Sequence, residues 1–240
     1  PDTWSVAPVF TQTDSTSTVR IAIGEGVDLY GNGEVTGDLR RNNTETVLWN
    51  TDNYEYKKHE GKRLYQSHPW ILGVRPDGTA FGVLADNSWK QEFDLHGGIA
   101  IKSYSAPFRV LVVDAPSPQR VMEKLGDLIG TIPMPPLWSL GYQQSRFSYY
   151  PADSVRYIAK EFRKRKIPAD VLWMDIDYMD GYRIFTFDPE GFPDPKKLNK
   201  DLHALDFKSI YMIDPGVKVD STYGIYQQGS RGNHWVLDAD

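Results

Sequence analysis

The pattern of hydrophobic residues changes near residue 130 of this 240-residue chain, and this change constrains the fold most strongly. Before it, short runs are wholly apolar or alternate apolar with polar residues, and turn sequences rich in Gly, Pro and Asp separate them. Short strands separated in this way are typical of an antiparallel β-sandwich. We expect strands at Val19–Ile23, Trp70–Val74, Ala80–Ala85, Ile99–Tyr104 and Phe108–Val113.

One helix is expected to close this first region. It begins after Ser117-Pro118, and apolar residues at the spacing i, i+4, i+7 and i+8 give it one hydrophobic stripe. The stripe consists of Val121, Leu125, Leu128 and Ile129.

After the proline-rich segment Ile132–Pro136, runs of strand length alternate with segments of helical period. This alternation indicates successive βα units and a parallel sheet. The polar residues Gln143, Asp175 and Asp214 follow the expected strands, at the edge that carries the active site in a βα barrel. The helices are expected at about Pro151–Lys166 and Pro195–Phe207, and the strands at Leu137–Tyr142, Ala169–Trp173, Ser209–Ile213 and, as a possible fourth, Trp235–Leu237.

Three or four parallel strands cannot close a barrel, which needs eight. An open doubly wound sheet usually carries a Gly-rich phosphate loop after its first strand, and Gln143–Tyr150 contains none. The expected fold is therefore a β-sandwich over residues 1–130, followed by the first βα units of an incomplete TIM (β/α)8 barrel over residues 131–240. We interpret the chain as a piece of a longer barrel enzyme.

The composition excludes several classes of function. The net charge is −5, and the only basic run, Arg163–Lys166, ends an expected helix, where cations complement the helix dipole. We therefore expect neither a nucleic-acid partner nor a membrane surface. The chain has no Cys, and its five His show no ligand spacing, so no metal and no cofactor is expected. No apolar run approaches the roughly 20 residues of a membrane-spanning helix; the cellular compartment stays open.

The segment Trp173–Asp188 is the richest in chemically active side chains. Asp175 and Asp177, spaced i, i+2 at a strand end, point the same way if the strand persists. Such carboxylates can accept substrate hydroxyls, act as general acid and base, or bind a metal. The structural alternative is that they and Asp180 pair with Arg183 or cap the following loop.

Several segments in order resemble a known family. They are Tyr30–Glu34 and Leu48–Asp52 in the first part, and Leu137–Tyr149, Trp173–Gly181, Phe185–Asp188 and Ile213–Gly216 in the second. Together they resemble glycoside hydrolase family 31, and among its subgroups the α-glucosidases. The family carries a mutarotase-like β-sandwich before a (β/α)8 barrel, so the resemblance implies this arrangement here.

The resemblance also implies roles for individual residues. Asp175 matches the carboxylate that accepts hydrogen bonds from the terminal sugar in the −1 subsite, where a charged acceptor gives a strong bond. Trp173 and Phe147 match aromatic walls of that pocket, and Val217 matches an apolar position in it. Asp52 matches a carboxylate on a sandwich loop that reaches toward the +1 sugar.

Asp177 and Asp214 are interpreted as groups that lie behind the pocket and hold its residues. Simpler interpretations stay open for three of the pocket residues. Trp173 and Phe147 could be ordinary core residues, and Asp52 could lie in a solvated turn.

The catalytic residues are expected to lie outside this chain. The family's nucleophile lies in a segment like Trp-x-Asp-Met-Asn-Glu, and the nearest segment, His234–Asp238, lacks that pattern. The implied reaction is retaining, exo-acting hydrolysis of terminal α-linked glucose by a pair of Asp residues beyond residue 240. The implied partners are an α-glucoside or oligosaccharide and the remainder of the barrel, as a continuation or a companion chain. The chain alone is expected to be inactive.

Other functions stay open at this point. Within the family they are a transglycosylase, an α-xylosidase and an α-glucan lyase. A non-catalytic carbohydrate-binding module on Leu29–Val113 is opposed by the βα units that follow. A dehydrogenase-like αβ protein is opposed by the missing Gly-rich loop.

Overall fold

The computed structural model describes residues 8–105 and 107–237 and divides into two compact units, the first ending at Ile132 and the second beginning at Pro133. Among the described residues, no helix is long and apolar enough to cross a membrane. The first unit contains β1 (Pro8–Gln12), β2 (Ser17–Ile21), β3 (Asp28–Gly33), β4 (Glu45–Leu48), η1 (Tyr54–Tyr56), η2 (Lys58–Gly61), β5 (Ser67–Val74), β6 (Ala80–Asp86), β7 (Gln91–Asp94), β8 (Ile99–Ser103), β9 (Arg109–Ala115) and α1 (Pro118–Ile129).

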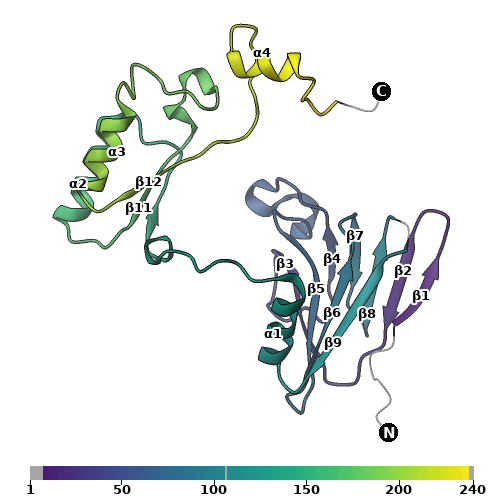
Figure 1. The fold of residues 1–240 in the computed structure, drawn as a ribbon. Helices are drawn as coiled ribbons and strands as arrows, with labels where there is room; N and C mark the ends of the chain where they lie inside the picture. The colour runs from purple at the N-terminus through teal and green to yellow at the C-terminus, as the bar shows by residue number, and fades with distance from the viewer. Residues whose placement is uncertain (1–7, 106, 238–240) are drawn as a thin grey trace. The chain divides into compact units, whose positions relative to one another are not determined.

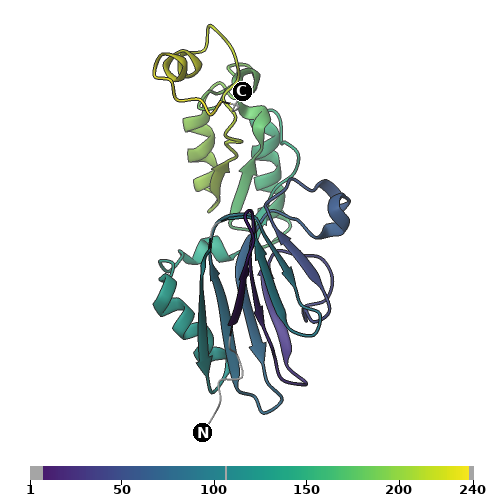
Figure 2. The ribbon, with the colours of Figure 1, turned by 90° about the vertical axis from the view of Figure 1, so that its right-hand side faces the viewer.

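The first unit is a β-sandwich (Figure 1, Figure 2). One antiparallel sheet has the strand order β1-β2-β8-β7-β4, and the other has the order β3-β5-β6-β9. All five expected strands are present, and β1, β3, β4 and β7 were not predicted. Apolar residues of both sheets form the core between them, among them Val19, Ile71, Phe81, Phe93 and Ile101.

Helix α1 covers the outer side of the four-stranded sheet. The Ser117 hydroxyl caps it by accepting a hydrogen bond from Arg120 N. Val121 and Leu125 pack with Trp70, as expected from the stripe. The last turn differs from the expectation of one continuous stripe, because Leu128 and Ile129 are exposed and contribute nothing to this cluster.

The glycines of the segment Tyr30–Glu34 have a structural reason. Gly31 has a φ of 128°, and a Cβ there would lie 2.3 Å from the carbonyl oxygen of Trp70. The pairing of β3 with β5 also shifts register between Gly31 and Gly33, which marks an irregularity in the strand. Only glycine fits this close approach of the two strands.

The second unit contains three short parallel strands, and two helices connect them, as the βα pattern predicts. The strand order follows the chain order, and the connecting helices lie beside the strands in Figure 1. Its elements are η3 (Leu137–Leu140), β10 (Gln143–Gln144), α2 (Ala152–Lys164), β11 (Val171–Met174), η4 (Ile176–Tyr178), η5 (Asp180–Tyr182), α3 (Pro195–His203), β12 (Lys208–Tyr211) and α4 (Gly224–Arg231).

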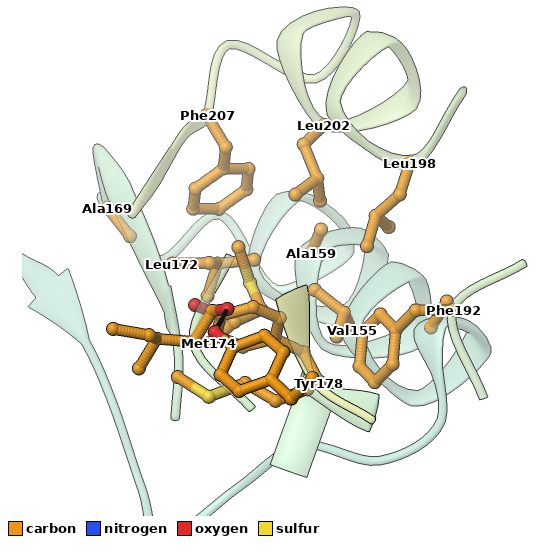
Figure 3. Packing of buried hydrophobic residues seen from close by; sticks show 14 residues of the cluster. Val155, Ala159, Ala169, Leu172, Met174, Tyr178, Phe192, Leu198, Leu202 and Phe207 are labelled. Carbon is orange, nitrogen blue, oxygen red and sulfur yellow. Dashed lines mark hydrogen bonds between the residues drawn. The ribbon is translucent and has the colours of Figure 1, made fainter. Parts of the chain in front are cut away.

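The apolar stripes of α2 and α3 face β11 (Figure 3). Val155 and Ala159 of α2 and Leu198 and Leu202 of α3 are buried against Leu172. The basic run at the end of α2 has a structural role, as expected. It complements the helix dipole, and it also forms hydrogen bonds that were not predicted. Its first arginine, Arg163, donates to the carbonyl oxygens of Leu205, Ala169 and Asp206 and lies over the ring of Phe207.

Two expected strands of this unit are wrong. Leu137–Leu140 forms a short 3₁₀ helix because the backbone and hydroxyl of Ser139 both donate to Pro136 O, and pairing with β11 begins only at Tyr142 O. Trp235–Leu237 is not a strand. Its tryptophan stacks on Tyr226 of α4, a helix that was not predicted, at 5.6 Å between ring centroids.

Candidate functional site

The carboxyl ends of the three parallel strands lie at one edge of the sheet. Asp175 directly follows β11, and pairing with the next strand continues there because Met212 N donates to Met174 O over 2.8 Å. Phe147 lies in the loop after β10, and Asp214 lies shortly beyond the end of β12. This edge therefore gathers the segments in which the sequence analysis placed the sugar pocket.

Side chains of β11 alternate between two faces of the sheet. Leu172 and Met174 lie in the buried cluster with α2 and α3. Trp173 belongs to none of the buried clusters formed by the described residues, and its indole nitrogen donates a 2.9 Å hydrogen bond to Gln143 Oε1. The backbone stays extended at Asp175 (φ −78°, ψ 178°), so alternation puts its side chain on the face of Trp173.

The Asp175 carboxylate has one engaged oxygen. Its Oδ1 accepts a 2.8 Å hydrogen bond from Ile176 N and so caps the 3₁₀ helix η4. The loop-capping alternative from the sequence analysis is therefore correct for this oxygen. Oδ2 has no hydrogen-bonding partner within residues 8–105 and 107–237, so it can accept bonds from a ligand.

The loop after Asp175 is held by internal hydrogen bonds. Asp177 accepts a 3.0 Å bond from the Tyr182 hydroxyl, which raises the pKa of that tyrosine. Tyr178 is buried and donates to Met212 O over 2.8 Å, which ties η4 to the end of β12. These contacts hold the loop after Asp175 and join it to the end of β12.

The main ion pair of this loop was not predicted. The guanidinium of Arg183 lies 3.6 Å from Asp180 Oδ1, too far for a strong hydrogen bond. It instead donates two hydrogen bonds, of 2.9 and 2.7 Å, to Asp220 Oδ2. The Thr222 hydroxyl and backbone N–H also donate to Asp220, and with Arg183 they lower the pKa of its carboxyl to about 2. The sequence offered no local signal for this pair, whose members lie 37 residues apart.

The other candidate pocket residues differ in their surroundings. Phe147 is 81 % exposed, so it is not a core residue of the described chain. Val217 packs against the buried cluster of the second unit. Asp214 has a φ of 47°, and its exposed carboxylate makes no hydrogen bond or ion pair with another described residue.

Asp52 lies on the sandwich unit, in the segment between β4 and β5. Its Oδ1 accepts a 2.9 Å bond from the Tyr65 hydroxyl, and this raises the pKa of Tyr65. The buried Asn53 organises the segment by bonding Lys58 and the carbonyl oxygen of Arg63. Asp52 is exposed to solvent, but its side chain is held in place by the hydroxyl of Tyr65.

One cluster has the residue types of a metal site. Atoms of Glu45, Asp94 and His96 lie within 4.8 Å of one another. Asp94 Oδ1 already accepts a hydrogen bond from Nδ1 of His96. The ammonium nitrogen of Lys62 lies 3.3 Å from Glu45 Oε2. Because neighbouring groups already engage these carboxylates, we assign no metal to the cluster.

An antiparallel sandwich followed by parallel βα units, with carboxylates at the strand ends, is the arrangement of a βα-barrel protein with an N-terminal sandwich domain. The galactose mutarotase-like N-terminal domain model of glycosyl hydrolase family 31 matches residues 8–94, and the TIM-barrel domain model of the same family matches residues 132–240. The chain belongs to glycoside hydrolase family 31.

Individual relatives agree with this assignment. Alpha-glucosidase 2 of Bacillus thermoamyloliquefaciens is 42 % identical over 88 % of this chain and 27 % of its own length. A family 31 alpha-glucosidase crystal structure from Bacteroides thetaiotaomicron is 54 % identical, with a TM-score of 0.84 over 91 % of this chain and 37 % of that one. A family 31 dextranase from Flavobacterium johnsoniae, complexed with glucose, is 28 % identical, with a TM-score of 0.73 over 84 % of this chain and 25 % of that one. The chain spans about a quarter of the length of the curated relatives that it matches.

Proposed function

We propose that residues 1–130 and 131–240 are the sandwich domain and the first part of the catalytic barrel of a retaining, exo-acting α-glucosidase. The observation that carries the proposal is the common face of Trp173 and Asp175 at the carboxyl edge of the parallel sheet. An indole beside a carboxylate with an unpaired oxygen suits a sugar ring, because the ring offers both C–H groups and hydroxyls. The relatives named alpha-glucosidase support terminal α-linked glucose as the substrate.

Each residue has a defined part in this proposal. Asp175 accepts hydroxyls of the terminal glucose through Oδ2 and orients the sugar. Trp173, held by Gln143, forms one wall of the pocket, and the exposed ring of Phe147 forms another. Val217 provides an apolar contact to the sugar ring in this pocket.

Three carboxylates act around that pocket. Asp177 holds the loop after β11 through its bond to Tyr182. Asp214 lies just beyond β12, and its carboxylate, which is unpaired among the described residues, bonds to residues of the later strands. Asp52, held in place by Tyr65, contacts the +1 sugar.

The chemical step uses two further carboxylates. One attacks the anomeric carbon and forms a covalent glucosyl intermediate, while the other protonates the leaving oxygen and then activates water. The nucleophile motif of the family is not found in the 240 residues. We therefore propose that later strands of the barrel, in a continuation of this polypeptide or a companion chain, supply both groups.

The test is the stereochemistry and specificity of the complete polypeptide that contains these residues. With an aryl α-glucoside, the product seen first by ¹H NMR should be α-glucose. β-Glucose as the first product would contradict a retaining mechanism. Preferred cleavage of an aryl α-xyloside, transfer of glucose to a second sugar, or elimination in place of hydrolysis would assign the chain to another reaction of the family.

A further inference from the structure

Two exposed tryptophans lie at one end of the five-stranded sheet in the sandwich unit. Trp49 directly follows β4, and Trp89 shortly precedes β7. These strands pair antiparallel with Leu48 opposite Gln91, so both tryptophans lie at the same end of the strand pair. Trp49 is 51 % exposed and Trp89 is 64 % exposed. Each therefore presents much of its ring to solvent.

The two tryptophans line a pocket with a volume of about 500 Å³. This volume falls within the roughly 300–1,000 Å³ of small-molecule sites. The other lining side chains include Asn50, Asn87, Ser67 and Gln91, and no charged residue is among the described residues that line it. Neutral amides and the residues Ser67 and Ser88 thus line the pocket together with two aromatic rings.

The polar groups of the pocket are partly fixed and partly unpaired. The Ser67 hydroxyl donates a 2.6 Å bond to Asn50 Oδ1, which leaves the Asn50 amide nitrogen without a partner in the described chain. Gln91 is 1 % exposed, and its Oε1 has no hydrogen-bonding partner there either. Its Nε2 donates to Asn87 O, which anchors the side chain. Gln91 Oε1 lies below the surface of the pocket, whereas the Asn50 side chain is exposed, so its amide nitrogen can donate to a ligand hydroxyl.

These features select one class of ligand. An ion would find no countercharge among the lining side chains, and a wholly apolar ligand would leave the amides unpaired. We propose that the pocket between Trp49 and Trp89 is a carbohydrate-binding site of the sandwich unit. Sugar rings stack their C–H faces on the indoles, and a sugar hydroxyl accepts a hydrogen bond from the amide nitrogen of Asn50. The proposed function enters only in the choice of α-linked glucose oligomers as probes.

The site extends beyond a single sugar ring. Trp89, Pro69 and Asn87 also line a neighbouring pocket of about 910 Å³. We therefore expect an oligosaccharide to bind more tightly than glucose.

Isothermal titration calorimetry of the 240-residue chain with maltotetraose and with isomaltotetraose tests the proposal. At least one of them should bind, and Trp89→Ala and Trp49→Ala should each weaken that binding by at least about tenfold. Phe10→Ala is the matched control, because Phe10 is a 52 % exposed aromatic residue of the same unit outside the pocket. It should bind like the unaltered chain. Unchanged thermal unfolding of each variant ensures that a loss reports binding.

Two outcomes would overturn the proposal. One is no heat of binding with either oligosaccharide at millimolar concentration. The other is binding that Asp175→Asn abolishes and the two tryptophan variants leave intact, because the sugar would then occupy the pocket of the proposed function. That second outcome would support the proposed function while it removes the sandwich site.

Discussion

The indole nitrogen of Trp173 donates a 2.9 Å hydrogen bond to Gln143 Oε1 across two neighbouring parallel strands. The amide nitrogen of Gln143 in turn donates to Ser139 O over 2.8 Å. Both the oxygen and the nitrogen of the Gln143 side-chain amide thus form hydrogen bonds. Through its indole N–H, the Trp173 ring is held in one orientation. A ring held in this way has little rotamer freedom to lose when a ligand binds.

Replacement of Gln143 tests this bond. We expect Gln143→Leu to lower the free energy of unfolding of the second unit by about 1 kcal/mol, because the indole N–H loses its acceptor. Urea unfolding measures the change. In a Trp173→Phe background the same replacement should cost less, since the donor is already absent. Equal costs in both backgrounds would show that the bond contributes nothing.

Replacement of Asp175 tests its proposed contact with substrate. In the complete enzyme, Asp175→Asn should lower kcat/KM for an aryl α-glucoside by at least about tenfold, because a charged acceptor of sugar hydroxyls is lost. Asp180→Asn is the control, since Asp180 is exposed and lies beside Arg183. It should cost much less. Steady-state kinetics at matched folded fraction gives the comparison, and the reverse order of effects would place the sugar elsewhere on this loop.

The 240-residue chain alone should release no glucose from maltose or from an aryl α-glucoside. Without a nucleophile the covalent intermediate cannot form. A coupled glucose assay on the purified chain, with the complete enzyme as a positive control, measures the activity. Turnover by the chain without a companion would show that its own carboxylates perform catalysis.

Acid should weaken the second unit through Asp220. Thr222 and Arg183 hold the pKa of this carboxyl at about 2, below its value in the unfolded chain. A lowered folded-state pKa stabilises the fold above the unfolded pKa, and this stabilisation is lost as the pH falls through the folded value. The free energy of unfolding should therefore decrease between about pH 4 and pH 2.

Asp220→Asn isolates this contribution. The variant keeps the shape of the side chain but has no charge to titrate, so its stability should fall less steeply over that range of pH. Urea unfolding at several pH values gives the slopes, and ¹³C NMR of the Asp220 carboxyl gives the pKa directly. Identical slopes for the two proteins would contradict the assignment.

The elements that the sequence predicted correctly are those whose pattern of burial is local. The stripes of α2 and α3 and the apolar run of β11 carry their periodicity within one segment, and each packs as its spacing indicates. The motif around Asp175 likewise lies in one stretch of chain, so its position at a strand end could be inferred. Site features that depend only on residues close together in the sequence could therefore be predicted from the sequence.

Tertiary structure decided the features that join distant segments. Strand β10 is only two residues long and exists because Tyr142 and Gln143 pair with β11, whereas the more apolar residues before it form a 3₁₀ helix. The Arg183–Asp220 ion pair and the Trp173–Gln143 bond join residues 37 and 30 positions apart, and the pocket between Trp49 and Trp89 arises from the pairing of β4 with β7. Periodicity in the sequence records which side of an element is buried, but the partner that covers it is chosen by packing and hydrogen bonding between elements, which a single sequence does not contain.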